Sequence, residues 1–169
     1  MCNITLVTRM LRDTHDTVLM STRLQALPGA GAKLGRLHLY ARLDAHVNGN
    51  GGGGSDNAGA NSGVVDPSGV PVVFGTNTVT NAVNRDYAVP TYMALAATSA
   101  QAASVGYAGT ASDGLTQLDS AHALTPYTSA PGGHVVATED VTPGGGHQVT
   151  LALGFGRTQA QSVSVAEAS

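Results

Sequence analysis

Residues 35–46 read Gly-Arg-Leu-His-Leu-Tyr-Ala-Arg-Leu-Asp-Ala-His, and residues 48–59 read Asn-Gly-Asn-Gly-Gly-Gly-Gly-Ser-Asp-Asn-Ala-Gly. In the first stretch, apolar and polar side chains alternate, which is the period of a β-strand with one buried face. The second stretch is rich in glycine, which loses much backbone entropy on ordering and buries no side chain. Such a run is typical either of a linker between two domains or of a long loop within one domain. The organisation of the chain depends on which of the two it is.

Size and composition indicate one folded domain. The chain has 169 residues, of which 42% are hydrophobic, enough for a core. Only 11% are charged, with a formal net charge of −3, and the scattered charges do not predict binding to nucleic acid or to an anionic membrane. No stretch approaches the roughly 20 apolar residues that span a bilayer, and the chain does not open with a signal-peptide pattern. Cys2 is the single cysteine, which excludes an intrachain disulfide.

Further strands are expected on both sides of the glycine-rich run. Val, Ile, Thr and Leu predict strands at residues 4–9, 17–24, 70–74, 77–83, 134–140 and 148–155. Residues 88–99 are ambiguous between helix and strand, residues 106–114 indicate a turn, and the Ala/Ser/Gln-rich tail at 158–169 favours the start of a helix. Several short strands separated by turns are typical of an antiparallel β-sandwich.

The sequence gives little support for a catalytic centre. Asp113 with Asp119, or Glu139 with Asp140, could be imagined as the carboxylate pair that glycosidic cleavage needs. Glu139 and Asp140, however, are neighbours on a predicted strand and point to opposite faces. The chain has no tryptophan and five dispersed tyrosines, so no aromatic platform for a sugar is evident. We therefore assign no catalytic and no substrate-binding residue.

No metal or cofactor site is predicted either. None of the six histidines pairs with a second ligand at a zinc-site spacing. The less favoured alternative is an oxygen-rich calcium site formed by Asp44, His46 and Asp56, although an EF-hand register is absent. The segment Gly-Ala-Gly-Ala-Lys at residues 29–33 lacks the spacing of a phosphate-binding loop and is interpreted as a turn.

Three segments carry a resemblance to a known family. They read Ser-Val-Gly-Tyr-Ala-Gly-Thr-Ala-Ser-Asp-Gly-Leu-Thr-Gln-Leu at residues 104–118, Gly-His-Val-Val-Ala-Thr at 133–138, and Thr-Leu-Ala-Leu-Gly-Phe-Gly at 150–156. In order and spacing they are similar to the N-terminal domain of bacterial glucodextranases and glucoamylases of glycoside hydrolase family 15. Residues 13–24, 36–46 and 55–59 also fall in the family's order, so the resemblance covers nearly the whole chain. His134 departs from it, because the family usually has asparagine there.

The resemblance implies an all-β fold, an antiparallel β-supersandwich related to galactose mutarotase. Residues 1–169 then form a single domain in which residues 47–63 are a Gly/Asn-rich internal loop. It further implies that the chain lacks the first part of the family's domain, and that residues 158–169 begin the linker to a separate (α/α)₆ barrel. Because the family's catalytic glutamates lie in that barrel, the chain alone is predicted to be inactive.

The preferred hypothesis that follows is a non-catalytic domain of a secreted enzyme that breaks down α-glucans such as starch or dextran. In this hypothesis the domain supports the barrel, its expected partner, and has a possible contact with the α-glucan. The alternative is a free-standing carbohydrate-binding or adhesion module with a polar, largely uncharged surface. Neither nucleic acid nor a membrane is an expected partner.

Overall fold

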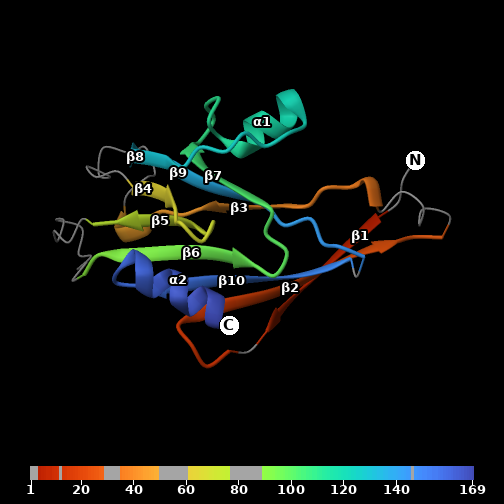
Figure 1. The fold of residues 1–169 in the computed structure, drawn as a ribbon, viewed down its shortest axis with the longest axis horizontal. Coiled ribbons are helices and arrows are strands. Elements are labelled where there is room, and N and C mark those ends of the chain that lie inside the picture. The colour runs from red at the N-terminus through yellow and green to blue at the C-terminus, as the bar shows by residue number, and fades with distance from the viewer. Residues whose placement is uncertain (1–3, 12, 29–34, 50–60, 77–88, 146) are drawn as a thin grey trace.

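The computed structural model describes residues 4–11, 13–28, 35–49, 61–76, 89–145 and 147–169. These residues form two antiparallel β-sheets that pack face to face, with a short helix against the outer face of each sheet (Figure 1). The predicted all-β antiparallel sandwich is therefore confirmed. Within the described ranges, no helix is both long enough and apolar enough to cross a membrane.

The larger sheet has seven strands in the order β1-β2-β10-β6-β5-β4-β8. Their bounds are β1 (Ile4–Leu11), β2 (Thr17–Ala26), β4 (Asn61–Val65), β5 (Pro71–Gly75), β6 (Thr91–Ala97), β8 (Ser129–Gly133) and β10 (Gln148–Gly156). Strand β10 pairs with β2 on one side and with β6 on the other. The sheet therefore joins its N-terminal hairpin to its middle strands only through a strand from the C-terminal end of the chain.

The smaller sheet consists of β3 (Tyr40–Asp44), β9 (Val135–Asp140) and β7 (Ala102–Tyr107), with β9 in the centre. Val135 and Ala137 of β9 face the larger sheet and share a core cluster with Val73 and Val105. The alternate residue Thr138 lies on the opposite face, against the start of the first helix. Both faces of β9 are therefore covered, which explains why its residues are almost all buried.

Helix α1 (Gly114–Ala121) lies against the smaller sheet, and α2 (Gln159–Ala168) lies against the larger one (Figure 1). Val163 and Ala166 of α2 share a second core cluster with Val72 of the larger sheet. The helix approaches β10 so closely that a Cβ atom at Gly154 would lie 2.5 Å from the carbonyl oxygen of Ser162. Glycine is therefore needed at position 154 for α2 to pack against β10.

The strands on either side of the glycine-rich run belong to different sheets of the same sandwich. Strand β3 leads into a 3₁₀ turn, η2 (Val47–Gly49), and β4 begins at Asn61. The side-chain amide of Asn61 donates a hydrogen bond to the carbonyl of Ala45, which ties the two ends together. The loop predicted over residues 47–63 extends too far, because residues 61–63 already pair in β4. Residues 50–60 lie outside the described residues.

Most of the other elements predicted from the sequence are present, and a few differ from the structure. The strands at 4–9, 17–24, 70–74, 134–140 and 148–155 are present with small shifts, the tail forms α2, and the ambiguous segment 88–99 contributes β6. The strand predicted over 35–46 is confined to Tyr40–Asp44. The turn predicted at 106–114 leads into α1, a helix that the sequence did not predict. The strand predicted at 77–83 lies outside the described residues.

Candidate functional site

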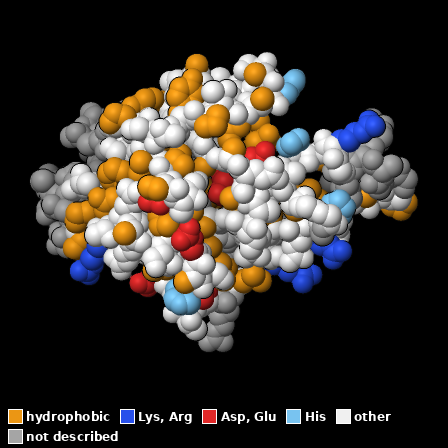
Figure 2. Space-filling view, in the orientation of Figure 1, with side chains coloured by type: hydrophobic (Ala, Val, Ile, Leu, Met, Phe, Trp, Pro, Cys, Tyr) orange, Lys and Arg blue, Asp and Glu red, His pale blue; other side chains and the backbone are white. Residues whose placement is uncertain are grey.

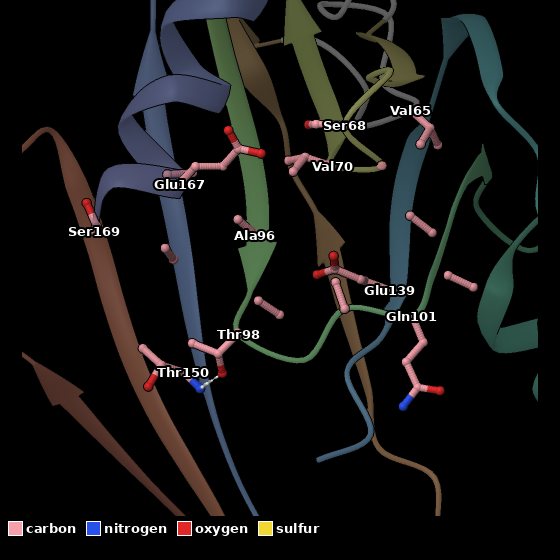
Figure 3. A pocket seen from close by; sticks show the side chains of 17 residues that line it. Val65, Ser68, Val70, Ala96, Thr98, Gln101, Glu139, Thr150, Glu167 and Ser169 are labelled. Carbon is pink, nitrogen blue, oxygen red and sulfur yellow. Dashed lines mark hydrogen bonds between the residues drawn. The ribbon is translucent and has the colours of Figure 1, made fainter. Parts of the chain in front are cut away.

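A cleft of about 420 Å³ opens beside the β4–β5 and β6–β7 turns and is lined by residues of both sheets and of α2 (Figure 3). Strands β9 and β10 and the last turn of α2 complete its walls. Alanines from both sheets supply small apolar surface, among them Ala96, Ala103 and Ala152. The polar side chains that line the cleft are Ser68, Thr98, Gln101, Glu139, Thr150, Glu167 and Ser169.

Glu139 is the buried acid of this cleft. It is 0% exposed, and neither of its carboxyl oxygens has a hydrogen-bond partner among the described residues. Burial raises the pKa of this carboxyl group to about 8, because removal from water disfavours the charged form. The group is therefore mostly protonated and neutral at pH 7. Figure 3 shows Glu139 extending from β9 and Glu167 extending from α2 toward the space between them.

The position of Glu139 follows from the alternation of β9. Val135 and Ala137 point into the core between the sheets, and Glu139 is the next residue on that face. Its cross-strand partners are Ala41 on β3 and Ala103 on β7. These two small residues leave room beside the carboxyl group but offer it no side-chain donor. The acid is thus held at the point where the apolar core gives way to the cleft.

The face that α2 covers has acidic side chains near its middle and arginine side chains near its edges (Figure 2). The chain as a whole also carries a formal net charge of −3. Such a distribution favours a neutral or cationic partner on this face over an anionic one.

A second polar cluster lies on the outer face of the smaller sheet. The Nε2 atom of His134 lies 2.7 Å from Oδ1 of Asp44, and the Nε2 atom of His46 lies 3.8 Å from the same oxygen. One side-chain nitrogen or oxygen from each of the three residues lies within 4.8 Å of the others. Partial burial would raise the pKa of Asp44, but hydrogen bonds from His134 and Arg42 hold it below its ordinary value.

Arg42 links this cluster to α1. Its Nη1 donates to Oδ2 of Asp44 at 3.0 Å, and its Nε and Nη2 donate to the two oxygens of Asp113 at 3.2 and 3.1 Å. Asp113, which is 2% exposed, also accepts hydrogen bonds from the backbone N–H groups of Gly109 and Leu115, so it caps the helix. Burial alone would raise the pKa of Asp113, but these bonds keep it below its ordinary value.

The carboxylates considered for catalysis stand in different surroundings. Asp113 is buried at the start of α1, whereas Asp119 is exposed on that helix. Glu139 faces the cleft, and Asp140 accepts a hydrogen bond from the backbone N–H of Thr142 at 3.0 Å. Within the part of the chain that the structure describes, Asp113 accepts hydrogen bonds from several donors, whereas Glu139 accepts none. Neither pair therefore forms a common site.

The residues considered for calcium are only partly placed. Asp44 and His46 lie together as expected, Asp56 lies outside the described residues, and His134 joins the other two instead. The glycine segment at 29–33 also lies outside the described residues.

Tyr92 stacks on Phe74 with ring centroids 4.8 Å apart, and its ring is therefore used in packing rather than offered as a sugar platform.

Comparison with known proteins decides the family. Residues 4–169 match the family described as glucodextranase, domain N. The chain belongs to this family. Its fold is similar to that of a bacterial glucoamylase crystallised with acarbose, with a TM-score of 0.70 and 18% sequence identity. The match covers 98% of this chain and 22% of the glucoamylase chain, so the chain spans about a fifth of that protein. No curated protein matches the sequence.

Two features of this glucodextranase N domain were not predicted from the sequence. The contact between His46 and His134 joins residues 88 positions apart in the sequence, so their spacing along the chain gives no sign of it. The burial of Glu139 had a usable signal, because it follows Val135 and Ala137 at a period of two. That signal could have marked the acid as inward-facing.

Proposed function

We propose that the chain is the non-catalytic N-terminal domain of a glucoamylase- or glucodextranase-type glycoside hydrolase, and that it supports a catalytic (α/α)₆ barrel. The observation that carries the proposal is the family match over residues 4–169. The similarity in fold to part of a bacterial glucoamylase supports it, because the chain corresponds to 22% of that protein and leaves most of its length for other regions. The substrate of the whole enzyme would be an α-glucan such as starch or dextran.

The use of the chain's own acids is consistent with a supporting role. Inverting cleavage of a glycosidic bond needs one acid and one base about 6.5–9.5 Å apart, with room for a water molecule. Asp113 is instead engaged by the guanidinium group of Arg42 and by two backbone N–H groups of its own helix region. Its carboxylate therefore holds α1 on the sheet and is not free to act on a substrate.

The cleft is a surface suited to contact with a neighbouring domain. Its alanine surface gains from removal from water, and the buried, neutral Glu139 adds no charge that a neighbouring domain would have to desolvate. We propose that the catalytic barrel, or the segment that leads to it, covers this region beside the last turn of α2. A direct contact with α-glucan and a location outside the cell belong to the same proposal, and the low charge of the chain fits both.

The test is release of glucose by the purified chain from soluble starch, maltooligosaccharides and dextran. We expect no turnover above that of a mock preparation from cells that lack the gene. Turnover that persists through further purification, and that follows the chain's elution profile, would overturn the non-catalytic assignment.

Carbohydrate contact has its own test. Titration of the chain with the same α-glucans by calorimetry should show weak binding at most, because the residues that line the cleft include no aromatic ring. Tight binding to free glucan by the isolated chain would instead favour a free-standing carbohydrate-binding module.

A further inference from the structure

The pairing of β3 with β9 places three side chains of types that can ligate a metal on one face of the sheet. Asp44 pairs with Val136 in the antiparallel ladder. His46 lies two residues after Asp44, and His134 lies two residues before Val136. Continuation of the same register therefore brings His46 opposite His134. The two imidazole rings meet edge to face, with centroids 5.2 Å apart. Asp44 and His46 are separated by two residues and therefore share a face of the strand.

The distances within this cluster suit a small metal ion. Tetrahedral zinc has ligand bonds of about 2.0–2.2 Å to nitrogen and oxygen, which places ligand atoms roughly 3.3 Å apart. The two distances from Asp44 Oδ1 to the histidine Nε2 atoms, 2.7 and 3.8 Å, lie on either side of that value. The side chains are 37–51% exposed, so they can make the small rotations that equal bonds require.

The surroundings prepare Asp44 to act as a ligand. Arg42 binds Oδ2 of Asp44, which leaves Oδ1 facing the two imidazoles. Arg42 is in turn fixed by the buried carboxylate of Asp113. An outer partner of this kind orients a ligating carboxylate. The charge of Arg42 is more than offset by those of Asp44 and Asp113, so the site keeps a net charge of −1 with both histidines neutral.

We propose that Asp44, His46 and His134 bind a divalent transition-metal ion of the zinc class, with a fourth position open to water. Two imidazoles and one carboxylate are ligands of zinc and its neighbours, whereas calcium takes oxygen ligands. The bound ion would fasten the end of β3 to the start of β9. This site is independent of the role proposed for the cleft and of any catalytic barrel.

The experiment uses the full chain without a polyhistidine tag, stripped with EDTA and then titrated with ZnCl₂ by calorimetry. We expect one Zn²⁺ per chain and no binding of Ca²⁺. At a free Zn²⁺ concentration about 100 times the dissociation constant, the melting temperature should rise by roughly 5–10 °C, because the ion binds the folded chain preferentially. In NMR spectra, the ring signals of two of the six histidines should shift.

Variants locate the site. His46→Ala and His134→Ala should each weaken Zn²⁺ binding by more than the roughly 10–100-fold that loss of an outer partner costs. His15→Ala is the matched control, because His15 lies 3.1 Å from Asp13 with the same two-residue spacing as His46 from Asp44. Asp44→Asn provides a second route to the same loss if a histidine variant does not fold.

Three results would overturn the proposal. They are no Zn²⁺ binding up to millimolar concentrations, binding that survives removal of either histidine in a folded variant, and an equal loss of binding in His15→Ala. The NMR titration of the unaltered chain gives an independent decision, because shifts spread over all six histidines would indicate non-specific binding.

Discussion

Replacement of Glu139 by glutamine should make the folded chain less sensitive to alkaline pH. Glu139 is fully buried with no hydrogen-bond partner among the described residues, and burial raises its pKa from 4.5 to about 8. Between these two values the unfolded chain has released the proton while the folded chain still binds it. The unfolded state therefore binds fewer protons, and the free energy of unfolding falls as pH rises.

The size of this effect follows from the two pKa values. One proton changes the free energy of unfolding by about 1.4 kcal/mol per pH unit in this range, so Glu139 should remove about 4 kcal/mol between pH 4.5 and pH 8. The penalty is absent below pH 4.5, where both states are protonated, and is nearly complete above pH 8. Since whole domains are stable by only about 5–15 kcal/mol, the loss should be large enough to measure.

The assay is urea unfolding followed by far-ultraviolet circular dichroism at pH 4.5, 6, 7 and 8, because the chain has no tryptophan. Glu139→Gln has a neutral side chain of similar shape, so its stability should match the wild type near pH 4.5 and exceed it by about 4 kcal/mol at pH 8. Glu167→Gln removes an acid from the same cleft and controls for the change in net charge. Parallel stability curves for wild type and Glu139→Gln would show that Glu139 is not protonated in the folded chain at these pH values.

Two further substitutions test the packing of the helices. Asp113→Ala should lower the free energy of unfolding by about 2–4 kcal/mol, because it removes the cap of α1 and leaves the partly buried guanidinium group of Arg42 without its main partner. Urea unfolding measures this loss, and Asp119→Ala, at an exposed position, is the control. Gly154→Ala should cost about 1–3 kcal/mol, because its Cβ would meet the backbone of Ser162; thermal melting measures it. Gly144→Ala, where a Cβ has open space, should melt as the wild type does, and equal losses for both glycine variants would contradict the packing described.

The strands were predictable where one face differs chemically from the other. In β10, the alternation of Val149, Leu151 and Leu153 identified the strand almost to its ends. The same alternation gave no sign that a helix packs on the other face of the strand. Ala152 and Gly154, the small residues between the large ones, are where α2 packs. Small residues between the large ones of a strand can therefore mark the face on which a helix packs.

Helix α1 escaped prediction because its signals are short and mixed with turn residues. It spans eight residues and follows a glycine-rich segment, which indicates a turn. Asp113, two positions before Leu115, is nevertheless a typical cap at a helix start. Strand β8 was not predicted because Pro131 and two glycines disfavour a strand in the middle of a sheet. Such residues are tolerated at the edge of a sheet, where β8 lies.

The polar clusters depend on contacts that the sequence does not state. Arg42 was predicted to lie on a polar strand face, and it does share that side of β3 with Asp44. Its partner Asp113 lies 71 residues away and meets it only because α1 folds over the smaller sheet. Register between strands, rather than spacing along the chain, decides such contacts.

The supporting role is tested most directly by measuring whether the chain stabilises a glucoamylase barrel from which the N-terminal domain has been removed. The barrel would be produced alone, fused to this chain, and fused to an unrelated β-sandwich of similar size. Melting temperature and soluble yield of the barrel would then be compared. We expect a higher melting temperature and yield with this chain than with either control. Equal values with this chain and with the unrelated sandwich would rule out a specific supporting role.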